Sequence, residues 1–258
     1  MLSVTVLASG SSGNALLVRA GGCAVLVDAG LSAKRITDHL EGLGLRAEDL
    51  SGILLTHEHG DHTRGLKVLC GKCPVPVFAT PLTAESLRRS GVVAEWNLFS
   101  SGAAFAVAAF EVVAFSVPHD AADPVGFVLR YGGRNFAILT DLGFGTRQVV
   151  ECVRGVDGLL IETNHDEALL QKDKKRPWSV KQRILSRHGH LSNAAAAGIV
   201  SQIATAALQH VILGHLSQDC NSSELAAGAV RQELEAAGHR EVAIHCAPTD
   251  GAGPHVTF

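Results

Sequence analysis

Titratable side chains crowd together at the end of one apolar run in this sequence. The stretch ILLTHEHGDH ends with five of them in six positions, namely His57, Glu58, His59, Asp61 and His62. A loop that leaves a strand can turn His57 and His59 toward one metal ion while Asp61 and His62 face a second. Imidazole and carboxylate groups are the ligands that suit Zn²⁺, Mn²⁺ and Fe. The pattern therefore predicts a metal site, and two ions would need further ligands from elsewhere in the chain.

Three more candidate ligands stand just after predicted strands. They are His119 in SVPHDA, Asp141 in AILTDLG and His215 in VILGHLS. Strand ends on one rim of a sheet sandwich can bring distant side chains together on a rigid scaffold. A lone histidine there is usually a surface residue, and a lone aspartate usually forms a turn or a helix cap. The HxHxDH pattern makes a ligand role the better interpretation for all three.

Composition narrows the class of protein. The chain has 258 residues, 47% of them hydrophobic and 18% charged, which is enough for a sizeable core in a single domain spanning residues 1–258. The formal net charge of −3 argues against a protein that coats nucleic acid through its overall charge. The N-terminal run MLSVTVLASGSSGN has no early Lys or Arg, and it breaks too soon for a signal peptide or a membrane span. We therefore expect a soluble cytoplasmic protein.

The predicted elements form two similar halves. Strands are predicted at Leu2–Ala8, Ala15–Ala20, Ala24–Val27, Gly52–Thr56, Phe105–Ala109, Glu111–Val117, Val125–Tyr131, Asn135–Thr140, Gly158–Ile161, His210–Leu213 and Val242–Cys246. Helices are predicted after the N-cap Ser32, at Thr146–Arg154, at Asn193–Ala207 after the N-cap Ser192, and at Ser223–Ala237. Strands followed by helix, and then the same again, indicate two sheets packed face to face with helices outside.

The motifs resemble a known family. THEHGDH, followed in order by His119, Asp141 and His215, resembles the metallo-β-lactamase fold superfamily of binuclear hydrolases. ASGSSGNALLV, VLVDAGLS, VPHDAADPVGF, LTDLG, IETNHD and RHGHLSN resemble its YycJ/WalJ-type branch, over nearly the whole chain from Ala8 to about Leu225. That branch is associated with nuclease activity on DNA, including 5′-to-3′ exonuclease activity. The resemblance implies an α+β fold, a four-layer αββα sandwich with the metals at one edge.

The resemblance also implies a ligand set for two divalent ions, Zn or Mn/Fe. His57, His59 and His119 would hold the first ion, Asp61, His62 and His215 the second, and Asp141 would bridge them. Two such ions would hold a bridging hydroxide that attacks a phosphodiester, or equally a thioester or lactam carbonyl. Asp61 is counted with the catalytic residues as well as with the ligands. Asp28 would either orient the HxHxDH loop or simply form a turn.

Glu162 and His190 are candidates for a proton-donating pair. Phosphodiester cleavage expels an alkoxide, which benefits from a general acid, and a histidine oriented by a carboxylate can supply the proton. The pair is similar to the acid dyad of the ribonuclease Z relatives, although Leu191-Ser192 replaces the Ser-Thr of their HST-like segment. Glu162 could instead be a surface residue at a strand end, and His190 could instead cap a helix.

Other candidates would bind the substrate. The segment Gln171–His190, called here the basic segment, is rich in Lys and Arg and carries one acid, Asp173. Cations for phosphates and a ring for stacking suit a single strand or an end of DNA, although such a run is often only a solvated face. GSSGN could form a wall of the site or a hairpin turn, and two histidines could line a phosphate pocket or be structural. The residues concerned are Ser11, Ser12, Asn14, His165, Lys174, Lys175, Arg176, Trp178 and His188.

Two other functions use the same features. A thioester or lactam hydrolase could have this metal site, but it would need neither the basic segment nor the Glu162–His190 pair. A regulatory module that binds nucleic acid with little activity would not need the complete set of seven candidate ligands. The sequence therefore favours a metal-dependent phosphodiesterase that acts on DNA.

Overall fold

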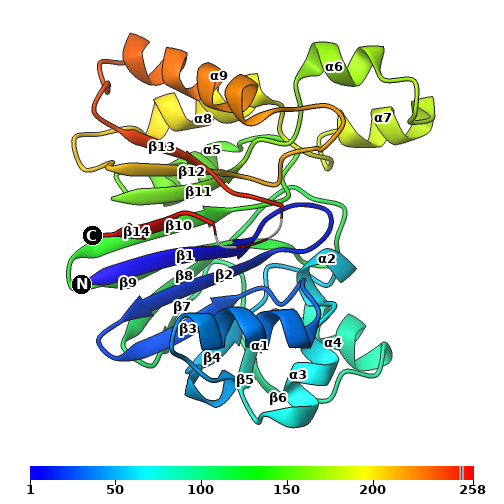
Figure 1. The fold of residues 1–258 in the computed structure, drawn as a ribbon, viewed down its shortest axis with the longest axis vertical. Helices are drawn as coiled ribbons and strands as arrows, with labels where there is room; N and C mark the ends of the chain where they lie inside the picture. Colours follow the sequence, from blue (N-terminus) through cyan, green and yellow to red (C-terminus); the bar gives the residue numbers. More distant parts are fainter. Residues whose placement is uncertain (250, 252) are drawn as a thin grey trace.

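Two seven-stranded sheets pack face to face in the computed structural model, which describes residues 1–249, 251 and 253–258 (Figure 1). The first sheet has the strand order β14-β1-β2-β3-β4-β5-β6, and the second has the order β13-β12-β11-β10-β9-β8-β7. The first sheet contains β1 (Leu2–Ala8), β2 (Ala15–Ala20), β3 (Cys23–Val27), β4 (Gly52–Leu54), β5 (Pro76–Ala79), β6 (Glu95–Leu98) and β14 (His255–Thr257). The second contains β7 (Ala104–Val107), β8 (Phe110–Ser116), β9 (Val125–Tyr131), β10 (Arg134–Leu139), β11 (Gly158–Glu162), β12 (His210–Gly214) and β13 (Ala243–Cys246).

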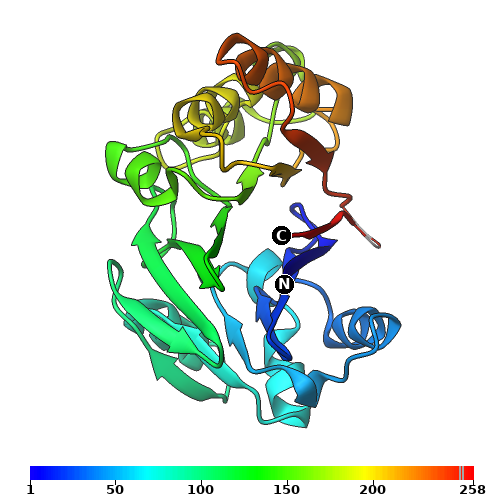
Figure 2. The same cartoon turned by 90° about the vertical axis from the view of Figure 1, so that its left-hand side faces the viewer.

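Helices cover the outer face of each sheet (Figures 1 and 2). The first sheet packs against α1 (Ala33–Gly42), α3 (Leu66–Lys72) and α4 (Pro81–Arg89), which share an apolar cluster with it. The second packs in the same way against α5 (Arg147–Val153), α8 (Asn193–Ile203) and α9 (Ser223–Ala236). A third cluster, which includes Val4, Phe110 and Ile212, joins the inner faces of the two sheets. The expected α+β, four-layer αββα sandwich is therefore confirmed.

Local signals in the sequence explain where the predicted helices begin. The Oγ of Ser32 accepts a hydrogen bond from the Arg35 N–H, and the Oγ of Ser192 accepts one from the Ala195 N–H. Each hydroxyl satisfies a backbone donor that has no partner within its helix. Ile36 and Leu40 then form the buried face of α1. Both N-caps agree with the prediction.

Several elements differ from the prediction or were missed. Helix α8 ends at Ile203 rather than Ala207, because Ala204 has an extended ψ of 131°. The short strands β5, β6 and β14 and the helices α3 and α4 were not predicted. Strand β5 has only four residues, and so short an apolar run carries little periodicity.

The remaining elements of the described residues are short. They are the helices α2 (Gly60–Thr63), α6 (Glu167–Lys172) and α7 (Trp178–Ile184) and the 3₁₀ turn Ala47–Asp49. In Figure 1, α6 and α7 project at the upper right, on the same side of the molecule as α2. Among the described residues, no helix combines the length and the apolar character that a membrane span requires.

Candidate metal centre

Parallel strands deliver three titratable side chains to one edge of the second sheet. Strands β10, β11 and β12 are neighbours and run parallel, with Leu139 opposite Ile161 and Glu162 opposite Gly214. Asp141, Glu162 and His215 stand at or just beyond the ends of these strands. Because carboxyl ends of parallel strands meet at one edge, residues far apart in the sequence lie together there. These three residues and His190 each place one ligand atom within 4.8 Å of the others.

The HxHxDH motif approaches this edge from the first sheet. It follows β4, and its last part forms the single turn of α2. His57 and His59 meet His119, and the three place ring nitrogens within 4.8 Å of one another. The Nδ1 of His119 lies 3.2 Å from the carbonyl oxygen of Gly189, which orients the ring. The family resemblance implied this group of three imidazoles.

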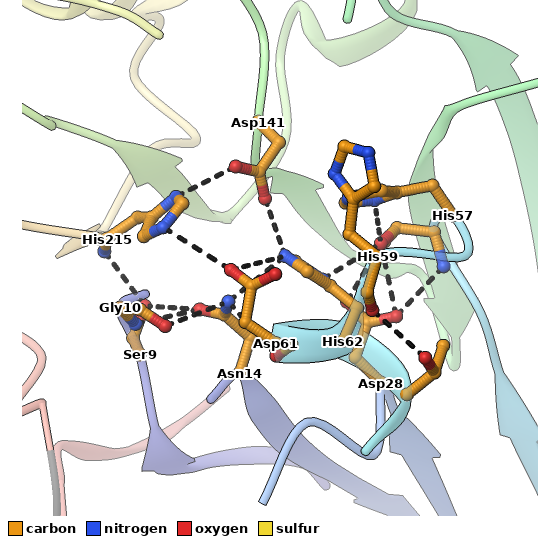
Figure 3. A network of polar contacts seen from close by, with 12 residues as sticks. Ser9, Gly10, Asn14, Asp28, His57, His59, Asp61, His62, Asp141 and His215 are labelled. Atoms are coloured by element: carbon orange, nitrogen blue, oxygen red, sulfur yellow. Dashed lines mark hydrogen bonds and ion pairs between the residues drawn. The ribbon is translucent and has the colours of Figure 1, made fainter. Parts of the chain in front are cut away.

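Asp141 stands between two other histidines of the predicted ligand set (Figure 3). Its Oδ2 lies 2.7 Å from His62 Nε2, and its Oδ1 lies 2.9 Å from His215 Nδ1. Asp61 approaches the same two rings, with its Oδ2 3.7 Å from His62 Nε2 and 3.8 Å from His215 Nε2. The two oxygens of Asp141 therefore face two different imidazoles.

Asp28 orients the motif from behind. It follows β3, which runs parallel to β4, and it is 3% exposed. Its Oδ1 accepts a hydrogen bond from the Thr56 N–H at 2.9 Å, and its Oδ2 accepts one from His62 Nδ1 at 2.7 Å. A carboxylate in this position fixes the ring and directs the other nitrogen of His62 toward Asp141. Of the two roles that the sequence left open, the contacts favour orientation of the loop.

Backbone strain is concentrated at the site. Asp28, Asp141 and His215 have φ values of 61°, 53° and 55°. This left-handed region is uncommon for residues other than glycine and costs of the order of 1–3 kcal/mol when the surrounding structure enforces it. Asp28 and His215 directly follow β3 and β12, and Asp141 stands two residues after the end of β10. The left-handed turn at each residue aims its side chain at the centre.

The donor set fits divalent metal ions. His57 is 1% exposed, and its Nε2 has no hydrogen-bond partner in the described part of the chain. Such an orphaned buried nitrogen is unusual unless a ligand completes it. Burial lowers the pKa of His57 well below its usual value, and the neighbouring His62 adds to the effect. The ring is thus neutral, the form that binds a metal.

His62 holds a proton that a metal would have to displace. Burial alone would lower its pKa, but the carboxylates of Asp28 and Asp141 outweigh burial and raise it to about 10. Ligation through Nε2 requires the unprotonated nitrogen. Below about pH 10, Zn²⁺ binding to metal-free protein should therefore release protons, and the affinity should rise with pH. Calorimetric titration in buffers of different ionisation enthalpy measures this release.

An Asp28→Asn variant provides the comparison for that titration. It removes one of the two charges that hold the His62 proton, so it should release fewer protons and show a shallower pH dependence. Binding that involves no protons in the unmodified protein would contradict this account of His62.

Glu162 and His190 form the predicted pair. The Nδ1 of His190 lies 2.6 Å from Glu162 Oε1, and the His190 side chain keeps 18% of its surface exposed while that of Glu162 is fully buried. Burial lowers the pKa of His190, but the charge and hydrogen bond of Glu162 outweigh it and raise the pKa. Glu162 Oε1 also lies 3.0 Å from His215 Nδ1. This second contact, which holds a predicted metal ligand, was not predicted from the sequence.

The GSSGN segment flanks the centre, with different roles for its residues. Ser11 and Ser12 are exposed and, with Arg176, Ser217, Gln218 and other residues, line a cavity of about 260 Å³. Asn14 is buried, and its Nδ2 lies 3.0 Å from His62 Nε2. The expected substrate contact of Asn14 therefore needs correction, because its side chain is buried and contacts the same nitrogen of His62 that faces Asp141.

The remaining candidates for substrate contact are divided by exposure. Trp178 is 64% exposed and His188 is exposed, so both can meet a substrate. His165 is 1% exposed, and neither ring nitrogen has a hydrogen-bond partner among the described residues. The sequence left open whether His165 lines a phosphate pocket or is structural, and its burial favours the structural role. Its strand-adjacent position in IETNHD gave no sign of this burial.

The basic segment is partly neutralised within the protein. Arg176 pairs with Asp173 Oδ2 at 2.8 Å and with Asp219 Oδ2 at 3.1 Å. Lys175 also pairs with Asp219, whereas Lys174 is exposed. Asp219 lies far along the chain, so its effect on this segment could not be predicted from local composition.

Comparisons with known proteins agree with this geometry. Residues 24–216 match the family model of the β-lactamase superfamily domain. Exodeoxyribonuclease YycJ of Bacillus anthracis is 39% identical over 92% of this chain and 90% of its own length. Exodeoxyribonuclease WalJ of Streptococcus pneumoniae serotype 2 (strain D39) is 36% identical over 86% of this chain and 84% of its own length.

Solved structures share the fold. The metallo-β-lactamase fold protein YhfI from Bacillus subtilis aligns with a TM-score of 0.75 over 99% of this chain and 98% of its own. At 15% sequence identity this similarity shows the fold alone. The family model, the two curated relatives and the cluster of imidazoles and carboxylates together carry the assignment. The chain belongs to the β-lactamase superfamily, as a metal-dependent hydrolase in the branch that contains YycJ and WalJ.

Proposed function

We propose that this protein is a DNA exonuclease that works in the 5′-to-3′ direction with two divalent metal ions, Zn or Mn/Fe. Relatives named exodeoxyribonucleases, similar over most of the chain, support a DNA substrate. The observation that carries the proposal is the Glu162–His190 contact of 2.6 Å beside the ligand cluster. A carboxylate-oriented histidine next to the metals is what departure of an alkoxide from phosphorus needs.

The seven predicted ligands divide between two ions. His57, His59 and His119 would hold one ion and Asp61, His62 and His215 the other, with Asp141 shared. Bound ions would activate a water as the nucleophile and neutralise charge on the phosphate. The two separate contacts of Asp141, to His62 and to His215, support its shared role.

His190 would protonate the leaving oxygen. Its Nδ1 is committed to Glu162, so its Nε2 is the nitrogen that can hand a proton to the substrate. Glu162 fixes the ring, stabilises its charged form and is itself held by the N–H groups of Leu142 at 3.1 Å and Leu191 at 3.3 Å. Strand cleavage then leaves a hydroxyl on the departing nucleotide chain.

The other two functions account for fewer of these contacts. A thioester hydrolase expels a thiolate, which leaves without a proton, so it leaves the Glu162–His190 pair without a role. A lactam hydrolase has no use for the exposed Trp178 and Lys174 of the basic segment. A regulatory module with a vestigial site leaves the strained turns at Asp28, Asp141 and His215 unexplained. Strain of this kind is retained where it serves a functional arrangement.

Purified, metal-loaded protein tests the proposal directly. We expect it to shorten single- or double-stranded DNA from the 5′ end, and to leave RNA and a thioester largely intact. Phosphorothioate linkages at the 5′ end should block digestion, whereas the same linkages at the 3′ end should not. Faster thioester hydrolysis, or digestion blocked only from the 3′ end, would contradict the activity or the direction respectively.

Trp178 is the exposed ring of the basic segment and should stack on a base. Base–aromatic stacking contributes about 1–3 kcal/mol per base. Trp178→Ala should therefore raise KM for single-stranded DNA about fivefold or more, and Lys174→Ala should add to the effect and weaken its salt dependence. Hydrolysis of bis-p-nitrophenyl phosphate should not change, since that substrate has no base.

Val180→Ala is the matched control for Trp178→Ala. Val180 is an exposed apolar residue of the same helix, at 40% exposure, and its loss should leave both substrates unaffected. If Trp178→Ala slows the small substrate as much as DNA, the ring has a structural role in α7.

A further inference from the structure

Most Lys and Arg side chains of the basic segment contact other groups of the protein. Arg187 lies over the ring of Phe144, with 4.4 Å between the guanidinium carbon and the ring centroid. Lys181 is buried, and its Nζ donates to the backbone carbonyls of Gln171 and Asp173. Lys175 and Arg176, between α6 and α7, pair with Asp219. These four side chains therefore already have partners within the protein and are less free to bind a phosphate directly.

Arg183 is different because it reaches toward the metal centre. Its Nε donates to Asp120 Oδ2 at 2.5 Å. The other oxygen of Asp120 lies 3.4 Å from Nε2 of His119, a predicted ligand. The Asp120 hydrogen bond raises the pKa of Arg183, and the carboxylates of Asp61 and Asp141 add to this shift. The guanidinium is thus within electrostatic reach of the centre, one carboxylate away from a ligand.

The free part of this guanidinium faces solvent. The Arg183 side chain is 59% exposed, and its two Nη groups have no polar partner among the described residues. A guanidinium presents paired N–H groups in a rigid fork that matches two oxygens of a phosphate. Because Nε is fixed by Asp120, the Nη pair is held in a defined direction. An exposed Arg–Asp pair stabilises a fold very little, so orientation is its main consequence.

We infer that Arg183 binds the backbone phosphate next to the scissile one, in a direction that Asp120 fixes. This inference rests on the proposed nuclease function. The scissile phosphate has to meet the ligand cluster, and the whole Asp120 carboxylate separates Arg183 from that cluster. The Nη pair therefore reaches the neighbouring linkage of the strand. Arg183 would act on binding of a longer strand and not on the bond that breaks.

Substrate length gives the sharpest test. A dinucleotide has one phosphodiester and no neighbour for Arg183, whereas a trinucleotide has two. Arg183→Ala should raise KM about tenfold or more for the trinucleotide, as expected for loss of charged hydrogen bonds. It should leave kinetics on the dinucleotide and on bis-p-nitrophenyl phosphate within about twofold. With longer DNA, the salt slope of log KM should fall by about 0.7, the share of one phosphate in a single strand.

Arg130→Ala is the matched control. Arg130 pairs with Glu111 at 3.2 Å and is 45% exposed, so its loss removes the same charge from a similar surface pair. It lies at the other end of β9 from Val125, whose N–H donates to the Thr56 carbonyl beside the centre. Arg130→Ala should leave the kinetics on every one of these substrates unchanged. Arg183→Lys keeps the charge but loses the fork and should behave nearly as Arg183→Ala.

Asp120→Ala tests the positioning role. It should raise KM for the trinucleotide by less than Arg183→Ala does, and elemental analysis should find its metal content unchanged. Applied together, the two substitutions should do no more than Arg183→Ala alone, because Asp120 acts through Arg183 in this account.

The outcomes separate the inference from the proposed function. An unmodified protein that cleaves no phosphodiester overturns the function itself. Normal DNA cleavage by both Arg183→Ala and Arg183→Lys overturns the inference and leaves the function intact. Equal losses on the dinucleotide and the trinucleotide would put Arg183 on the scissile phosphate, again against the inference. Arg183→Ala could instead lower the thermal stability much more than Arg130→Ala does, with KM unchanged. The Arg183–Asp120 contact would then serve to stabilise the fold.

Discussion

His190→Ala should lose about 10²–10⁴-fold in kcat on DNA while its metal content stays unchanged. The size of the loss follows from the leaving group. DNA cleavage expels an alkoxide, which departs slowly without a proton, and His190 is the histidine whose ring is fixed by Glu162 at 2.6 Å. On bis-p-nitrophenyl phosphate the loss should be far smaller, because a nitrophenolate departs without a proton.

Glu162→Gln should follow the same pattern more weakly. Glutamine keeps the shape of the side chain but removes the charge that raises the pKa of His190. The acid should then be effective only at lower pH, so the pH limit for DNA cleavage should move downward. Since Glu162 also contacts His215, metal content has to be measured for this variant.

His210→Ala is the matched control for His190→Ala. His210 begins β12, at the opposite end of that strand from His215. Its loss removes an imidazole from the same sheet without touching the centre. His210→Ala should therefore leave kcat unchanged on both DNA and bis-p-nitrophenyl phosphate. Equal losses of His190→Ala on DNA and on the nitrophenyl ester, with metal retained, would make His190 a phosphate-binding residue. Loss of metal would make it a ligand.

Asp141→Asn should have the second large effect, on metal binding. Asp141 faces His62 at 2.7 Å and His215 at 2.9 Å, so its charge serves both sides of the cluster. Loss of an outer partner alone typically lowers metal affinity about 10–100-fold, and loss of a shared ligand should exceed that. We expect elemental analysis to find two equivalents of metal in the unmodified protein after saturation, and fewer than two in the variant. DNA cleavage should fall in parallel.

Two comparisons make this prediction specific. His215→Ala removes a ligand from one side and should chiefly weaken one ion. Asp157→Asn changes another buried aspartate, which precedes β11 at the far end of the sheet and accepts a hydrogen bond from the Asn135 N–H at 2.8 Å. It should leave metal content unchanged. One equivalent or less in the saturated, unmodified protein would contradict the two-ion proposal.

Local patterns in the sequence predicted most of the long strands and the types of side chain that could act as ligands. Alternation and apolar runs predicted β1 and β2 with the bounds that the structure has, because both strands are long and buried. The N-caps Ser32 and Ser192 predicted where two helices begin, since capping is a contact over three residues. The short strands β5, β6 and β14 were missed, because pairing with distant strands stabilises them more than any local pattern does.

The sequence by itself determined which side chains would be available for metals and a general acid, through residue types placed after apolar strands. Only the tertiary structure decided their partners. It put Glu162 between His190 and His215, Asn14 beside Nε2 of His62, and Asp120 beside Arg183. It also buried His165 and neutralised Arg176. The physical reason is that each of these facts depends on strand register and on loops that meet from opposite sheets. Burial and charge pairing arise from such long-range contacts, which no local spacing encodes.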